Sequence, residues 1–282
     1  MASAKEVRRR IKSVVSTKQI IKAMELISVI KMQKAIAINA ASRNYSEAAE
    51  AILWNLVTDI NEADHPFLLP DNEATKQLVV IITSDRGLCG GLNSKAIRMV
   101  LDLSKDRDTD FLTIGRKGRD LLRVLGKNII ADFTKIEEKP EIKDILPISK
   151  IITDDFVSGK YKGIKLVYTH FVSTLAQEPT ATKLLPLENK QKSLSQERIV
   201  FEPEKHALLD DLIPRLMEIK IWQSMLESIA SEHSARMMAM KNASENAVEL
   251  IDDLTLAYNQ TRQATITREI AEISAGKMTL EG

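Results

Sequence analysis

Residues 215–274 form a long stretch without a helix-breaking residue, since they include neither Pro nor Gly. Residues taken at alternating steps of three and four form a seam with a period of about 3.5, and most of its side chains are apolar or small. This period on a long helix indicates a partner helix and a left-handed supercoil. About 60 helical residues would measure roughly 90 Å, so we expect another helix to lie along them. The seam comprises Leu216, Ile219, Gln223, Leu226, Ala230, His233, Met237, Met240, Ser244, Ala247, Ile251, Leu254 and Tyr258.

The start of the chain supplies the expected partner. No Gly precedes Gly87 and no Pro precedes Pro66, and the pattern predicts one helix over residues 4 to about 60. Lys18 and Ser28 interrupt its seam. Since the rest of the chain lies between the two terminal helices, we expect these helices to pair antiparallel. The seam comprises Val7, Ile11, Val14, Ile21, Met24, Met32 and Ala35.

The middle of the chain alternates short apolar runs with helical patterns. Residues 77–84 form a short, continuous apolar run that is rich in β-branched side chains. Such a run is typical of a strand that is buried on both faces. Asn93 or Ser94 is expected to cap the next helix. Strand alternating with helix predicts a small α/β domain with a mostly parallel sheet. We expect strands at 77–84, 110–115, 128–133 and 164–168, helices at 95–105, 116–125 and 149–158, a turn-rich segment at 137–144, and edge strands at 181–187 and 198–202.

The predicted fold class is therefore α+β, with a long antiparallel coiled coil of the N- and C-terminal helices and a central, small, Rossmann-like α/β domain. The expected domains are residues 1–65, 66–203 and 204–282. Pro203 favours a helix start at Glu204 or Lys205. Pro214 is expected to kink or divide the last helix, and Gly276 to end it.

Charge is uneven although the net charge is only +1. The first 35 residues hold nine Lys and Arg residues against Glu6 and Glu25. This excess is compatible with a solvated basic face, a targeting segment or a basic arm that meets an acidic partner; the seam that continues from Val7 speaks against the targeting segment. The single Cys89 excludes a disulfide within the chain and fits a reducing compartment. No apolar run approaches ~18 residues, so no membrane span is expected.

Candidate catalytic groups are sparse. The loop at residues 87–93 follows a predicted strand but lacks the endings of phosphate-binding loops, so its glycines are better explained by a tight turn. Cys89 is interpreted as a small buried residue, and the four histidines lack ligand spacing. We therefore expect no catalytic residue, no metal and no cofactor.

The seam becomes polar after Tyr258. The tip of the helix then either contacts another protein or extends past its partner helix into water, and the residues alone leave both alternatives open. The polar residues are Thr261, Arg262, Gln263, Thr265, Thr267, Arg268, Glu269 and Glu272.

Several motifs resemble the gamma-subunit family of F-type ATP synthases over almost the whole chain. They are IKS at 11–13, TKQI at 17–20, KAMELISVIKM at 22–32, TSDRGLCGGLN at 83–93, EHSARMMAMKNASEN at 232–246 and LAYNQTRQATITRE at 256–269. The resemblance implies a non-catalytic central rotor shaft that couples ion-driven rotation of the c-ring to conformational cycling of the catalytic beta subunits.

The resemblance also implies partners and contact residues. Lys22, Met24 and Lys31, with Arg262, Gln263, Thr267 and Glu269, would contact the alpha and beta subunits. Phe201, Glu202 and Glu204 would lie on the side of the c-ring and the epsilon subunit. The delta subunit would be reached only through the complex, and neither nucleic-acid binding nor membrane insertion is implied. The expected location is the cytoplasmic face of a bacterial plasma membrane, as a peripheral protein. The alternative from the basic arm is a coiled-coil adaptor that binds nucleic acid or an acidic protein.

Overall fold

The structure is a computed structural model that describes residues 4–58, 65–68, 74–135, 140–187 and 205–281. The chain forms two compact units. The helix-pair unit comprises Met1–Ile27 and Met237–Gly282, and the sheet unit comprises Ser28–Arg236. The elements in chain order are α1 (Ala4–Thr58), β1 (Gln77–Ile82), α2 (Leu92–Leu103), β2 (Thr109–Ile114), α3 (Arg116–Val124), β3 (Ile129–Phe133), α4 (Ile142–Val157), β4 (Gly163–Phe171), β5 (Gln177–Leu185) and α5 (Lys205–Glu281).

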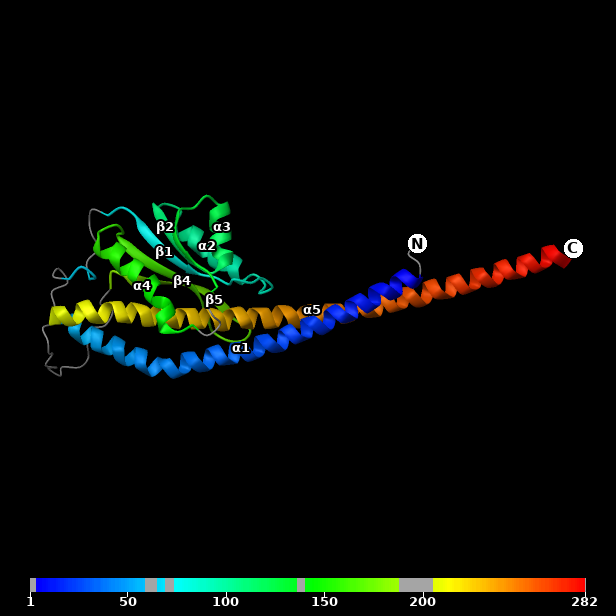
Figure 1. Cartoon of the computed structure of the whole chain (residues 1–282), viewed down its shortest axis with the longest axis horizontal. Coiled ribbons are helices and arrows are strands. Elements are labelled where there is room, and N and C mark those ends of the chain that lie inside the picture. The colour runs from blue at the N-terminus through cyan, green and yellow to red at the C-terminus, as the bar shows by residue number, and fades with distance from the viewer. Residues whose placement is uncertain (1–3, 59–64, 69–73, 136–139, 188–204, 282) are drawn as a thin grey trace. The chain divides into compact units, whose positions relative to one another are not determined.

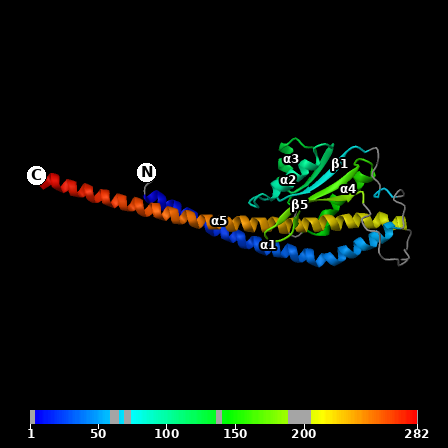
Figure 2. The same ribbon diagram turned by 180° about the vertical axis from the view of Figure 1, so that it is seen from behind.

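In the helix-pair unit, the first part of α1 lies antiparallel to α5 (Figures 1 and 2). The pattern of burial has the predicted period. Val7 is buried, while Ala4, Ile11, Val14, Lys18 and Ile21 are half-buried between exposed neighbours. On α5, Met240 and Ala247 are buried, and Ser244, Ile251, Leu254 and Tyr258 are half-buried. Lys18 therefore occupies a seam position despite its charge, since its aliphatic stem can pack while the ammonium reaches water.

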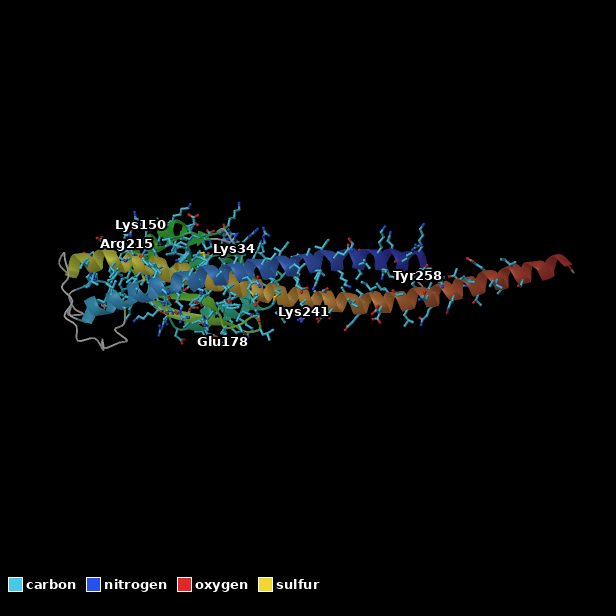
Figure 3. All side chains as sticks on the ribbon, turned by 90° about the horizontal axis from the view of Figure 1, so that it is seen from below. Lys34, Lys150, Glu178, Arg215, Lys241 and Tyr258 are labelled. Atoms are coloured by element: carbon cyan, nitrogen blue, oxygen red, sulfur yellow. The ribbon has the colours of Figure 1, made fainter. Side chains whose placement is uncertain are left out.

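The end of α5 extends past the start of α1. Tyr258 lies beside the first turns of α1 in Figure 3. Beyond Thr261, every side chain that the structure describes, at residues 262–271, 273 and 274, is exposed within this chain. The sequence left two alternatives for this tip, contact with another protein or extension into water. The structure shows that its residues have no packing partner inside the described part of the chain.

The sheet unit is built on five strands in the order β3-β2-β1-β4-β5. β1 pairs in parallel with β2 and β4, β2 pairs in parallel with β3, and β5 runs antiparallel to β4 at the edge. All six residues of β1 are buried, because helices cover both faces of the sheet. Leu78, Val80 and Ile82 face α4 and α5, whereas Val79 and Ile81 face α2 and α3. The α/β organisation predicted from alternating patterns is thus confirmed.

Helix α5 completes the backbone hydrogen bonding of β4. Pro179 of β5 stands opposite Thr169 of β4 and has no N–H to donate. Instead, the Ser231 hydroxyl donates to the Thr169 carbonyl at 3.1 Å, and the Thr169 N–H donates to Ser228 Oγ at 3.1 Å. All three groups are buried. These two bonds satisfy the N–H and the carbonyl of Thr169 in β4, at the position where the edge strand β5 has a proline.

Most predicted element boundaries agree with the structure to within a few residues, but three details were wrong. Asn93 does not cap α2, which begins at Leu92 after Gly91. Helix α4 begins at Ile142, not near Ser149, because the Glu141 N–H donates to the Asp144 carboxylate at 2.9 Å and starts the helix earlier. β5 begins four residues before the expected edge strand. The edge strand expected at residues 198–202 lies outside the described residues.

The last helix also differs from the prediction. α5 begins at Lys205 as expected, but it continues as one helix through Pro214 and through Gly276. Pro214 is tolerated because the buried side chains of Ile213 and Leu216 hold the helix on the sheet unit on either side of it. Tertiary packing here outweighs the lost backbone hydrogen bond.

Three polar side chains meet near the start of β2, and two of them, Asp110 and Tyr161, are buried. The Tyr161 hydroxyl donates to Asp110 Oδ2 at 2.9 Å, and Asn128 Nδ2 donates to Asp110 Oδ1 at 2.8 Å. Tyr161 is fully buried. Burial, together with the hydrogen bond to the Asp110 carboxylate, raises the pKa of Tyr161 well above that of a free tyrosine.

We expect Tyr161→Phe to flatten the alkaline side of the stability profile. An unfolded tyrosine loses its proton near pH ~10, whereas the folded chain keeps it to higher pH. The unfolded state then binds fewer protons, so the free energy of unfolding falls by up to about 1.4 kcal/mol per pH unit above that point. Urea unfolding between pH 9 and pH 11 measures this slope, with the exposed Tyr45→Phe as a control. Parallel curves for wild type and Tyr161→Phe would contradict it.

Candidate functional site

The usual ligand position of such a sheet is at the carboxyl ends of β1 and β4, where the strand order changes direction. Here, the side chain of Arg236 on α5 binds the loop that follows β1. The Arg236 guanidinium donates to the Gly87 carbonyl through Nε at 3.3 Å and through Nη2 at 3.2 Å, and it pairs with Glu232 at 2.6 Å. Arg236 is 7 % exposed. The loop is therefore held against α5 by the chain's own groups.

The N-terminus of α3 is likewise bound by a group of the chain itself. Asp85 accepts the backbone N–H of Arg116 at 2.8 Å and that of Lys135 at 2.9 Å. A helix N-terminus attracts anions through these unpaired N–H groups, and here a carboxylate of the chain already takes that place. The loop at residues 87–93 thus behaves as the tight turn predicted from its glycines.

Asn93 has a different task from the predicted cap. Its side chain accepts the Ser84 N–H at 3.0 Å and donates to Ser84 Oγ at 2.7 Å, which ties the two ends of the loop together. It also lies 3.3 Å from Cys89 Sγ. Cys89 is 2 % exposed, as expected for a small buried residue.

The predicted partner-contact residues fall on both terminal helices. Lys22 is exposed and pairs with Glu25 at 2.9 Å, Met24 is half-buried, and both belong to the helix-pair unit. Lys31 is half-buried in the sheet unit. The exposed tip of α5 carries Arg262, Gln263, Thr267 and Glu269 within two turns. Phe201, Glu202 and Glu204 lie outside the described residues.

The remaining seam positions are packed in the sheet unit. Met32 and Ala35 of α1 are buried, and so are Leu226, Ala230 and His233 of α5; Met237 is half-buried in the helix-pair unit. Ser28, which interrupts the apolar pattern, is only 2 % exposed. Its position therefore belongs to the seam although its side chain is polar.

An apolar surface on the helix-pair unit was missed by the sequence reasoning. Ile266, Ile270 and Ile273 follow one another at steps of four and three on the tip of α5, and they are 46 %, 59 % and 73 % exposed. Ile20 and Ile27 of α1 are likewise exposed at 61 % and 50 %. The spacing of the three tip isoleucines would have predicted an apolar stripe. Exposed apolar residues grouped in this way are typical of a surface that binds another protein.

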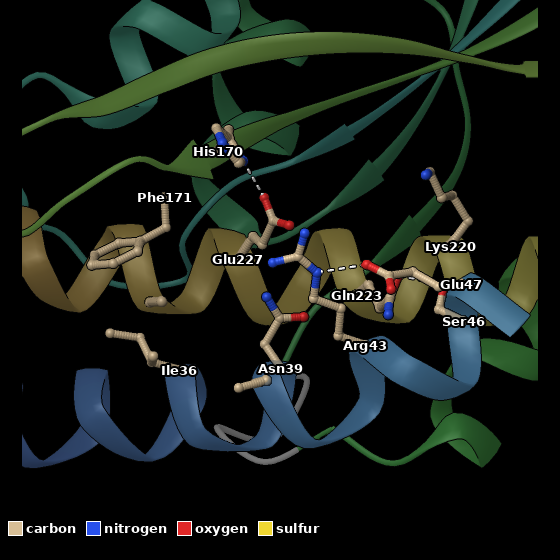
Figure 4. Close-up of a pocket in the computed structure, with 12 residues that line it drawn as sticks. Ile36, Asn39, Arg43, Ser46, Glu47, His170, Phe171, Lys220, Gln223 and Glu227 are labelled. Carbon is tan, nitrogen blue, oxygen red and sulfur yellow. Dashed lines mark hydrogen bonds and ion pairs between the residues drawn. The ribbon is translucent and has the colours of Figure 1, made fainter.

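The sheet unit also contains a polar pocket of about 500 Å³ between α1, α5 and the end of β4 (Figure 4). Its charges are arranged in pairs. Arg43 Nε donates to Glu47 at 2.7 Å, His170 Nδ1 contacts the Glu227 carboxylate, and Ser46 Oγ donates to Gln223 at 2.9 Å. Gln223, a polar residue at a seam position of α5, was the sequence signal for this gap between the helices. Since both signs of charge are present and paired, the pocket does not select one ligand class.

Two further observations concern the part of the chain that the structure describes. No group of three or more His, Cys, Asp or Glu side chains is arranged there to hold a metal ion. Among the described helices, none is long and apolar enough to cross a membrane.

Comparison with known proteins gives matches along the whole chain. A family model described as ATP synthase matches residues 3–280. The ATP synthase gamma chain of Thiobacillus denitrificans is 39 % identical over 287 residues, covering 98 % of this chain and 99 % of that protein. The ATP synthase gamma chain of Pelotomaculum thermopropionicum is 40 % identical over 285 residues and both chains are covered in full.

Solved structures show the same fold. A chain of the Euglena gracilis mitochondrial ATP synthase rotor has a TM-score of 0.68 at 18 % identity, covering 93 % of this chain and 98 % of that one. A chain from the central stalk and c-ring of the Tetrahymena thermophila mitochondrial ATP synthase has a TM-score of 0.65 at 26 % identity, covering 80 % and 99 %. From the family model and from relatives that match end to end, we conclude that the chain belongs to the ATP synthase gamma chain family.

Proposed function

We propose that this chain is the central rotor shaft of an F-type ATP synthase, which couples ion-driven rotation of a c-ring to conformational cycling of catalytic beta subunits in ATP synthesis or hydrolysis. The observation that carries the proposal is the end-to-end match to ATP synthase gamma chains, which includes the motifs of both terminal helices. The alternative of a nucleic-acid-binding adaptor gains no support from these relatives.

The exposed surface of the helix-pair unit supports this role. A helix pair without a further binding partner would keep its apolar residues in the seam and its outer faces polar. Here isoleucines of both helices and the tip residues Arg262, Gln263, Thr267 and Glu269 face outward. A surrounding hexamer of alpha and beta subunits would cover such a surface. Because the surface is asymmetric, each beta subunit would meet different side chains as the shaft turns, and these differential contacts would shift its conformational equilibrium.

The shaft would itself be non-catalytic. At the edge of the sheet where a nucleotide would be expected, Arg236 occupies the loop after β1 and Asp85 occupies the start of α3. The proposed mechanical role therefore assigns the chemistry to the beta subunits. Lys22, Met24 and Lys31, together with the tip of α5, would supply the contacts that carry the motion to them.

The other proposed partners would bind a different part of the chain. The epsilon subunit and the c-ring would bind near Phe201, Glu202 and Glu204, and the delta subunit would be joined through the complex. Since the gamma chains that match this sequence at about 40 % identity come from bacteria, the proposed location is the cytoplasmic face of a bacterial plasma membrane, as a peripheral subunit.

Co-purification tests the proposed function. A tag on this chain, expressed in its own host, is expected to retain alpha and beta subunits in equal amounts and in threefold excess over the tagged chain, with epsilon and the c-ring in detergent extracts. An untagged strain is the control. Recovery of nucleic acid through a strongly salt-dependent interaction, without alpha and beta subunits, would instead support the adaptor.

A further inference from the structure

Helix α5 changes character along its contact with the sheet. Up to Ile221 this contact is apolar, and Ile213, Met217 and Ile221 belong to the core on that side of the sheet. Further along the helix, serines follow at steps of four, three and three residues, which is helical spacing. All four are buried. They are Ser224, Ser228, Ser231 and Ser234.

Three of these serines hydrogen-bond the main chain of β4 and of the turn that follows it. Ser228 Oγ accepts the Thr169 N–H, and the Ser231 hydroxyl donates to the Thr169 carbonyl, both at 3.1 Å. The Ser234 hydroxyl donates to the Thr174 carbonyl at 2.7 Å, in the turn between β4 and β5. We refer to Ser228, Ser231 and Ser234 as the serine track.

The turn between β4 and β5 is itself held in one shape. The Ser173 N–H donates to the Ala176 carbonyl at 3.0 Å, and Ser173 Oγ accepts the Ala176 N–H at 3.1 Å. Gln177 Nε2 donates to the Ser173 and Thr174 carbonyls at 3.1 and 3.0 Å, and to Ser234 Oγ at 3.2 Å. Because the turn has a fixed shape, its bond to Ser234 positions the end of the hairpin on α5.

The serine track matches the main chain in one register only. A slip of α5 by three residues would bring Met225 to the place of Ser228, or Met237 to the place of Ser234. A slip by four residues would bring Glu227 or Glu232 into the buried contact. Each slip would leave at least one buried main-chain group without its serine, which costs the desolvation of that group. Apolar contacts do not discriminate in this way, because the hydrophobic effect is non-directional.

The stability of α5 alone does not account for the serines. Alanine has a higher helix propensity than serine and has no polar side-chain atom to bury. In coiled coils, a buried polar residue at an otherwise apolar position specifies the register of the helices at a cost in stability. The serine track has the same properties, since its residues are buried, polar and matched to one set of main-chain groups.

We propose that the members of the serine track are positioning residues, which fix the axial register and the rotation of the β4–β5 hairpin, and with it the sheet, on α5. The purpose of this role rests on the proposed function. Helix α5 continues to Glu281 and carries the tip residues assigned to the hexamer. In the proposed rotor, a slip between the hairpin and α5 would be motion lost between the sheet and those contacts.

The first experiment measures the distance between two nitroxide spin labels in the full-length chain by double electron–electron resonance. The labels are attached at Arg215→Cys on α5 and Leu175→Cys in the turn, both exposed positions, in a chain that also carries Cys89→Ser. With the serine track intact, we expect one narrow distance distribution. Replacing all three serines with alanine should broaden it or add a second distance, displaced by one helical turn of about 5 Å.

An unchanged distribution would overturn the proposal, even if the melting temperature fell, because a merely structural role predicts that combination. Ser228→Ala alone removes one bond and should broaden the distribution less, which keeps the test decisive if the triple variant does not fold. The matched control is Ser104→Ala with Ser158→Ala. These two hydroxyls donate to carbonyls of their own helices, at 3.0 Å in both cases, so the control should keep the narrow distribution.

A second measurement separates this proposal from the proposed function. In inverted membrane vesicles, the triple variant should pump fewer ions per ATP hydrolysed than the control variant does. A broadened distance distribution in a chain that retains no alpha and beta subunits would support the positioning role and count against the rotor. A narrow distribution in a chain that does retain them would leave the rotor in place and remove the positioning role.

Discussion

Ala247→Trp is expected to separate α1 from α5 in the helix-pair unit. Ala247 is 8 % exposed and occupies a seam position between the half-buried Ser244 and Ile251. An indole at this place cannot be accommodated without moving the helices apart, and overpacking of this kind costs about 1–3 kcal/mol or more. The variant should melt at lower temperature by circular dichroism, and it should recover fewer alpha and beta subunits in the co-purification.

Leu256→Trp is the matched control. Leu256 lies on the same helix but is 61 % exposed, so the same indole can extend into water there. If Ala247→Trp melted and assembled like Leu256→Trp, the seam assigned to α5 would be wrong. A loss of both properties in Ala247→Trp alone supports the pairing.

Met24→Lys is expected to impair energy coupling far more than folding. Met24 is half-buried on α1, and lysine is as good a helix former as methionine, so its stem can keep part of the packing while the ammonium reaches water. In the proposed complex, the new charge would lie at the moving contact with a beta subunit. We expect ATP-driven ion pumping by inverted membrane vesicles to fall several-fold relative to the rate of ATP hydrolysis.

Val124→Lys controls for the added charge. Val124 is 81 % exposed on α3 of the sheet unit and is not among the residues assigned to the hexamer contact. Normal ion pumping per ATP hydrolysed in Met24→Lys would remove Met24 from the coupling role. Equal losses in both variants would indicate a general effect of the charge.

The parts of the fold that follow from repetition could be predicted from the sequence. The seam is visible because small and apolar residues recur from Leu216 to Tyr258, and β1 is visible because residues 78–82 form an unbroken apolar run between two helix layers. Details that depend on which of two possible hydrogen-bonding partners a side chain takes could not be predicted from the sequence. Asn93 is a good helix cap in isolation, but Ser84, nine residues earlier, offers it two hydrogen bonds.

The candidate contact surfaces also differ in whether the sequence could reveal them. The tip of α5 was singled out because its seam became polar, yet the stripe of Ile266, Ile270 and Ile273 beside the polar residues was missed. An isoleucine in a sequence gives no indication of whether it is covered.

The contact of α5 with Thr169 has a mechanical consequence. Because Ser228 and Ser231 bond the main chain of β4 instead of a side chain, a force on this stretch of α5 reaches the sheet without first bending any flexible rotamer of the strand. Stiffness at this joint is thus insensitive to which side chains line β4, and it depends on two small hydroxyl groups, those of Ser228 and Ser231.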